Sequence, residues 1–180
     1  MMATEDPDPA STLIAPTVVV NISIADSGWQ DVDIDLQHLS DQAATLALSD
    51  HDLDHSELTI AFGSDAWIKQ LNQQFRGIDK ATNVLAFPDS GSGTYLGDLA
   101  LARETVIQEA NAENKSLTDH LSHLIVHGCL HLLGYDHLVN DDAEQMEALE
   151  IQLLARIGIT NPYQEMIDPL ATAPGCQKNP

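Results

Sequence analysis

The sequence is poor in positive charge. Seven Lys and Arg residues stand against 28 Asp and Glu residues, and the formal net charge is −21. The first 68 residues contain thirteen acids and no Lys or Arg. A chain of this charge repels polyanions at long range, so any polyanion must be bound at a local exception. We therefore do not expect DNA as a partner.

Cysteines, long apolar runs and a basic N-terminus are also lacking. Two cysteines, Cys129 and Cys176, cannot form a disulfide framework, which favours a reducing compartment. The longest apolar runs, such as residues 16–20, are far shorter than the roughly 20 residues of a membrane span. The first ten residues are acidic, whereas a signal peptide needs positive charge. These features predict a cytoplasmic protein with no membrane partner.

The chain has enough apolar residues, 43% of 180, to build one hydrophobic core. Residues 1–16 and 164–180 have little to bury and are expected to be tails around a single domain at 17–163. Alternating and helical hydrophobic patterns predict four strands and about five helices, and hence an α+β fold. The expected strands are 18–24, 57–63, 83–88 and 95–102, and the expected helices are 36–47, 65–75, 102–114, 119–133 and 141–157.

The most informative stretch is HGCLHLLGYDH, which runs from His127 to His137. On a helix His127 and His131 lie one turn apart and project from one face. Gly134 can end that helix in a left-handed conformation, and the short link after it could return His137 to the same point. Three imidazoles with an open fourth position are typical of a catalytic zinc site.

The other histidines and Cys129 have weaker patterns. His120 lies near the helix start and is expected on the solvated surface. His123, one turn before His127, either borders the site or packs in the core. Cys129 points away from the ligand face and is expected to be a small core residue. The scattered histidines are expected to be dispensable: His38, His51 and His55.

The spacing of His127, His131, Gly134 and His137 matches the metzincin protease pattern HExxHxxGxxH at every position but one. The exception is Gly128, which replaces the Glu that serves those proteases as general base. A metal site is therefore expected without the acid–base group of a protease.

Several motifs together resemble the YbeY family, bacterial single-strand-specific endoribonucleases of ribosomal RNA maturation. HGCLHLLGYDH is similar to that family's signature, and residues 71–88, LNQQFRGIDKATNVLAFP, resemble its segment LNxxYRxxDxxTDVLSFP. GDLALA at 97–102 and the end of the chain from Met146 to Tyr163 resemble further family motifs. The family usually has Asp and Ser where this chain has Asn83 and Ala86, so a role for a charged group at position 83 is in doubt.

The resemblance implies a zincin-like α+β fold with a small mixed four-stranded sheet. It implies one metal per chain, zinc or another divalent transition metal, held by His127, His131 and His137. It also implies a catalytic role for Arg76 in RNA cleavage, maturation of the 16S rRNA 3′ end and ribosome quality control. The implied partners are single-stranded RNA and the small ribosomal subunit or a protein on it.

The residues themselves leave the role of Arg76 open. It follows a predicted amphipathic helix and precedes Gly77, where a guanidinium can emerge from a loop and clamp a phosphate. It could equally be a surface Arg paired with one of many carboxylates. Water or the RNA 2′-hydroxyl could act as nucleophile in a site that has Gly128 in place of Glu.

Two other functions fit parts of the pattern. One is a zincin-like metallohydrolase of another substrate class, such as a peptidase, which Gly128 argues against. The other is a ribosome-associated binding factor with a structural metal. Structural zinc sites nearly always use four protein ligands, so this reading would need Cys129 or Asp136 as the fourth.

Overall fold

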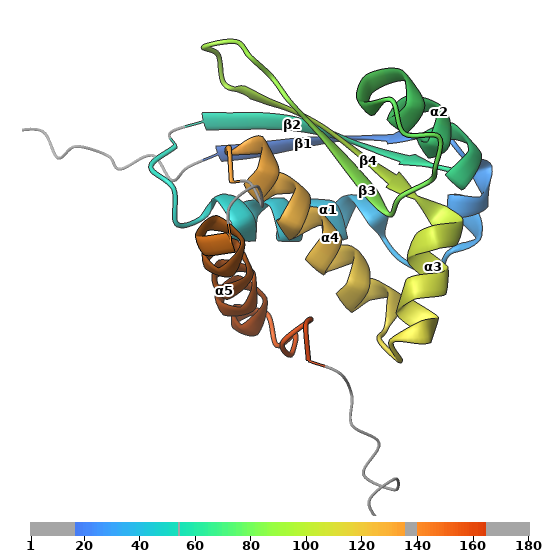
Figure 1. The fold of residues 1–180 in the computed structure, drawn as a ribbon. Coiled ribbons are helices and arrows are strands. Elements are labelled where there is room, and N and C mark those ends of the chain that lie inside the picture. Colours follow the sequence, from blue (N-terminus) through green and yellow to red (C-terminus); the bar gives the residue numbers. More distant parts are fainter. Residues whose placement is uncertain (1–16, 54, 136–139, 165–180) are drawn as a thin grey trace, which may run out of the picture.

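The structure, a computed structural model, describes residues 17–53, 55–135 and 140–164. Within them four strands form one sheet and five α-helices pack around it, as the α+β prediction expected (Figure 1). The elements in chain order are β1 (Thr17–Ile24), the 3-10 helix η1 (Ser27–Asp31), α1 (Leu36–Leu48), β2 (His55–Gly63), α2 (Asp65–Arg76), β3 (Val84–Pro88), β4 (Tyr95–Ala102), α3 (Arg103–Ala112), α4 (Leu117–Leu132) and α5 (Asn140–Arg156).

The sheet is mixed, with strand order β1-β2-β4-β3. β1 pairs with β2 and β2 with β4 in parallel, whereas β3 and β4 form an antiparallel hairpin. Turn-forming residues between positions 89 and 93 predicted this hairpin. β1 and β3 are therefore the two edge strands of the described sheet.

Helices cover both faces of the sheet. α1 and α4 pack on one face, and α2 lies on the other (Figure 1). Side chains of β3 alternate between these layers, as the pleat of a strand requires. Leu85 and Phe87 join the cluster under α2, whereas Val84 and Ala86 pack against the main core with α4.

α4 is the central helix of the larger layer. It contacts α1, α3 and α5 as well as strands β3 and β4, so ten of its sixteen residues are buried. A helix surrounded in this way is held rigidly, and side chains on it keep a fixed geometry. None of the helices in the described part of the chain is both long enough and apolar enough to span a membrane.

Candidate active site

α4 has well-defined ends that fix the position of its histidines. The Ser116 side chain caps its start by accepting a hydrogen bond from the Asp119 amide at 3.0 Å. After its last turn Gly134 has a φ of 93°, the left-handed conformation that the sequence predicted. The Gly134 amide bonds to the His131 carbonyl, and the Tyr135 amide bonds to the Leu130 carbonyl at 3.1 Å. This is a Schellman motif, and it ends the helix directly after His131.

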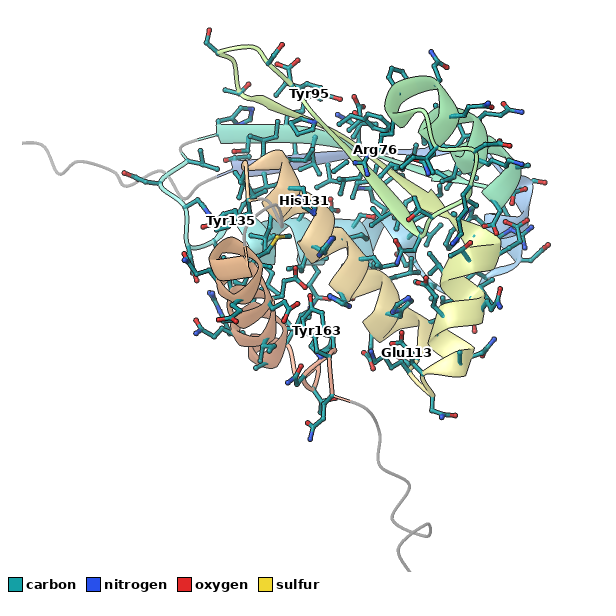
Figure 2. The ribbon with its side chains drawn as sticks, in the orientation of Figure 1. Arg76, Tyr95, Glu113, His131, Tyr135 and Tyr163 are labelled. Carbon is teal, nitrogen blue, oxygen red and sulfur yellow. The ribbon has the colours of Figure 1, made fainter. Side chains whose placement is uncertain are left out.

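The same turn holds the His131 ring. Its Nδ1 lies 2.8 Å from the backbone carbonyl of Tyr135. A carbonyl can only accept, so Nδ1 carries the proton and Nε2 is the nitrogen with a lone pair. Figure 2 shows His131 and Tyr135 near this end of α4. Metal-binding imidazoles in proteins are usually oriented by a hydrogen bond of this kind.

His127 lies one turn earlier and is oriented by a carboxylate. Its Nδ1 is 2.8 Å from Glu150 Oε1, and its ring centroid lies 4.7 Å from that of His131. Because Glu150 accepts at Nδ1, Nε2 of His127 also carries the lone pair. The structure thus confirms that both histidines share one face of α4. His137, the third predicted ligand, lies outside the described residues.

Glu150 of α5 is fully buried and is the centre of a hydrogen-bond network. It accepts from His127, from His123 Nε2 at 2.8 Å and from the Tyr163 hydroxyl. Burial alone would raise its pKa, but hydrogen bonds from His123 and His127 lower the pKa to about 2. Burial and the neighbouring Glu150 together raise the pKa of Tyr163, which keeps its proton on the hydroxyl. Glu150 is therefore an ionised acceptor with three donors around it.

His123, His127 and Glu150 also form a cluster that could hold a metal ion, since their ligand atoms all lie within 4.8 Å of one another. In that arrangement a metal would sit on the Nδ1 side of His127, where Glu150 now accepts a hydrogen bond. His123 thus borders the site, which is one of the two positions the sequence left open. Tyr163 lies beside α4 and α5 and closes this side of the cluster (Figure 2).

Sequence reasoning missed Glu150 and Tyr163 as site residues. A signal for Glu150 was present, because it occupies the apolar stripe of its helix between Met146 and Leu153, both of which are buried. A carboxylate at a core position of an amphipathic helix needs a buried donor. Nothing local in the sequence marks Tyr163, which reaches the site from beyond the end of α5.

The prediction of a solvated His120 is wrong. His120 is 4% exposed, because α3 packs against the start of α4 and Glu109 of α3 lies 3.0 Å from His120 Nε2. Glu109 also accepts from Asn83 Nδ2 at 3.0 Å. Burial raises the Glu109 pKa, but the hydrogen bonds from His120 and Asn83 outweigh it and hold the pKa below its usual range.

Asn83 has a structural role that depends on its amide group. Its Oδ1 accepts from the Val84 amide at 2.7 Å while its Nδ2 donates to Glu109. An Asp in this position could not donate to Glu109 and would face it with like charge. The amide at position 83 is therefore matched to Glu109 in this chain.

Gly128 is required by packing between α4 and the sheet. A Cβ at this position would lie 2.8 Å from Cδ2 of Leu99, which is fully buried in β4. The Glu of the protease pattern would therefore have to displace the buried Leu99 side chain. Cys129, the next residue, is 1% exposed, as predicted for a core residue, and burial raises the pKa of its thiol to about 12.

Arg76 is the last residue of α2, and Gly77 ends the helix with a φ of 72°. Its guanidinium donates through Nη2 to the backbone carbonyl of Ala86 at 3.5 Å, the outer limit of a hydrogen bond. This contact places Arg76 against edge strand β3, and the residue is exposed to solvent. Figure 2 labels its side chain near the sheet. Its side chain is thus placed to meet a ligand at the sheet edge.

Comparison with known proteins identifies the family. Residues 23–158 match the family described as Endoribonuclease YbeY. The chain belongs to the YbeY endoribonuclease family. One curated relative, from Methylocella silvestris, is named Endoribonuclease YbeY. It is 43% identical to this chain over 165 residues, which cover 86% of this chain and 89% of the relative. The relative from Bradyrhizobium diazoefficiens is 48% identical over 132 residues and covers 68% of this chain and 72% of its own.

A solved structure shows the same fold. The solution structure of TM1509 from Thermotoga maritima matches with a TM-score of 0.52, covering 81% of this chain and 99% of that one. At 23% identity this likeness concerns the fold alone. The family resemblance seen in the sequence is confirmed, and with it the α+β fold with a four-stranded mixed sheet.

Proposed function

We propose that this member of the YbeY family is a metal-dependent endoribonuclease that cuts single-stranded RNA. The observation that carries the proposal is the paired orientation of His127 and His131, each held at Nδ1 so that Nε2 carries the lone pair. Two imidazoles fixed in this tautomer on one helix face provide two ligand nitrogens that are already oriented for a metal ion. The family relatives bear the name of an endoribonuclease.

We assign His127, His131 and His137 as the ligands of one zinc ion, or another divalent transition metal, per chain. Three imidazoles suit zinc and leave a coordination position for a reactant. When bound, the ion supplies Lewis acidity at the scissile phosphate. Glu150 in this assignment orients His127 rather than serving as a ligand, because both of its oxygens already accept hydrogen bonds from His123, His127 and Tyr163.

The structure disfavours the two rival functions. A peptidase of the metzincin type needs a Glu at position 128, and Leu99 occupies the space that its side chain would require. A structural metal would need a fourth protein ligand. Of the two candidates, Cys129 is a poor ligand because its thiol is buried and stays protonated, and Asp136 lies outside the described residues.

Arg76 is proposed to bind the substrate phosphate. A guanidinium can make two parallel hydrogen bonds to a phosphate and neutralise charge that develops on its oxygens during cleavage. The nucleophile is either water or the RNA 2′-hydroxyl. The test is cleavage of a labelled single-stranded RNA by metal-loaded protein, with product ends analysed. A 2′,3′-cyclic phosphate indicates attack by the 2′-hydroxyl, and a 5′-phosphate with a 3′-hydroxyl indicates attack by water.

We further propose ribosomal RNA as the substrate, processed at the 16S 3′ end in the cytoplasm, with a further part in ribosome quality control. A net charge of −21 disfavours tight binding of free RNA, since few phosphates can be neutralised. Delivery by a partner, the small ribosomal subunit or a protein on it, would overcome this repulsion. An absence of cleavage by the metal-loaded protein on both free RNA and small subunits would refute the proposal.

Replacing Arg76 with Ala is expected to lower kcat/KM for RNA cleavage about 10–150-fold, because about 1.5–3 kcal/mol of charge-assisted hydrogen bonding is lost. Metal content should stay unchanged, since Arg76 bonds to the Ala86 carbonyl and lies on α2, whereas the proposed histidine ligands of the described part lie on α4. The matched control is Arg156→Ala, which removes an exposed Arg paired with Asp50. Equal cleavage by wild type and Arg76→Ala would remove Arg76 from the mechanism.

Replacing Glu150 with Gln is expected to weaken metal binding about 10–100-fold, because His127 loses the charged acceptor that orients it. Competition with a chromophoric chelator measures the dissociation constant. Glu147→Gln, an exposed neighbour on the same helix, should bind metal as wild type does. An unchanged dissociation constant in Glu150→Gln would show that Glu150 does not position the ligand.

A further inference from the structure

Most of the Lys and Arg side chains in the described residues are neutralised by carboxylates. Four of the basic side chains in the described part of the chain form ion pairs: Lys69 with Asp79, Arg103 with Asp26, Lys115 with Glu113 and Arg156 with Asp50. Arg76 and Lys80 have no carboxylate partner among the described residues. In a chain with 28 acids, two neighbouring cations without an acid mark a site where negative charge can be received.

An exposed apolar patch lies at the same place. Phe75 is 59% exposed and Ile78 is 52% exposed, the two highest values among the large hydrophobic residues described. They flank the Arg76–Gly77 pair at the end of α2. An exposed apolar patch with cations beside it is typical of a binding surface.

The Phe75 ring is held in place rather than freely mobile. It packs against Phe87 of β3 edge to face, with ring centroids 5.1 Å apart and an angle of 66°. Phe87 in turn joins the apolar cluster under α2. The loop after α2 is fastened as well, since Asn72 Nδ2 donates to the Lys80 carbonyl at 2.7 Å. The aromatic ring and the loop backbone at Lys80 are therefore held in place.

This surface lies next to the helix that carries the histidines. Edge strand β3 separates the two, with Phe87 on the α2 side and Ala86 packed on the α4 side. The Ala86 carbonyl is also the contact of Arg76. The Phe75 surface and α4 therefore lie on opposite sides of the same edge strand.

We infer that Phe75 is a stacking platform for an unpaired nucleobase of the RNA substrate, with Arg76 and Lys80 receiving the adjacent phosphates. This inference rests on the proposed function. Aromatic rings beside cations bind single strands because every base has a π-face, whereas the bases of a duplex are stacked on one another and inaccessible. The surface would therefore give the enzyme its preference for single strands.

Full-length, metal-loaded protein tests this with a short single-stranded RNA, its duplex and an otherwise identical strand with abasic positions. Phe75→Ala should raise KM for the single strand about 5–150-fold, the expected loss of one stacked base, with unchanged metal content. Phe75→Tyr should restore it. The control Val19→Ala, a truncation on the opposite edge strand, should behave as wild type. On the abasic strand, wild type and Phe75→Ala should differ little.

A tryptophan at position 75 gives a second readout. Of the two native tryptophans Trp29 is 1% exposed and Trp67 is half-buried, so the quenching that a stacked base adds is measured as the difference between Phe75→Trp and wild type. Strong quenching by single-stranded but not abasic RNA is expected from Phe75→Trp.

Equal KM values for wild type and Phe75→Ala on the single strand, with cleavage itself still present, would overturn the stacking role. Loss of small-subunit binding with unchanged KM on free RNA would assign the patch to a protein partner instead. No cleavage by wild type would refute the proposed function.

Discussion

Replacing His131 with Ala should remove the bound metal and reduce RNA cleavage by more than about 100-fold, which corresponds to about 2.7 kcal/mol or more of lost transition-state stabilisation. The Tyr135 carbonyl orients the His131 ring through Nδ1, and that carbonyl belongs to the turn that ends α4. An Ala at this position has no nitrogen to bind the metal. Elemental analysis of the purified protein gives metal content, and single-turnover cleavage of a labelled RNA gives the rate. His127→Ala and His137→Ala should behave in the same way.

Two controls make this result specific. His38→Ala changes an exposed histidine on α1 and should retain metal and activity. His123→Ala separates the two ways a metal could bind near Glu150. Full metal content in His123→Ala supports ligation through His127 and His131, whereas loss of metal there and retention in His131→Ala would place the ion in the His123, His127 and Glu150 cluster.

Replacing Gly128 with Glu should destabilise the protein by at least about 3 kcal/mol and create no peptidase. The added Cβ alone would lie 2.8 Å from Leu99, an overpacking that costs about 1–3 kcal/mol, and the carboxylate would then enter an apolar interface. For a chain of this size the melting temperature should fall by roughly 6–12 °C or more. Thermal unfolding followed by circular dichroism measures the shift.

Gly93→Glu is the matched control, because Gly93 is exposed between β3 and β4 and an added Cβ would come no closer than 3.9 Å to its neighbour, the Tyr95 amide nitrogen. Its melting temperature should stay close to that of wild type. A Gly128→Glu protein as stable as wild type would show that α4 can move away from β4. Peptidase activity in Gly128→Glu would contradict the prediction, because it would show that a Glu at position 128 can be accommodated and can act as general base.

Local sequence patterns predicted the parts of the site that lie on one helix. The spacing of His127 and His131 and the left-handed Gly134 follow from interactions between residues close in the chain, and the structure confirms both. The hairpin of β3 and β4 was predicted for the same reason. The ligand set itself remains a prediction, because its third member lies outside the described residues.

The parts that sequence reasoning missed depend on contacts between distant elements. Glu150 lies 23 positions after His127 in the sequence and contacts it only because α5 packs against α4. Hydrophobic periodicity within one helix does not predict such a contact. His120 was placed on the surface because its helix position is near an end, but α3 folds back over that end. Phe75 was assigned to an amphipathic helix face, and only its exposure in the fold distinguishes it from a core residue.

The link between α4 and α5 through Glu150 has a consequence for how the protein matures. Glu150 and Tyr163 belong to the last part of the domain to be synthesised. His123 and His127, which donate hydrogen bonds to Glu150, come earlier in the chain. Until the C-terminal helix docks, the His127 ring lacks the partner that fixes its tautomer. The candidate metal site is therefore completed only when α5 and the segment that carries Tyr163 have docked against α4.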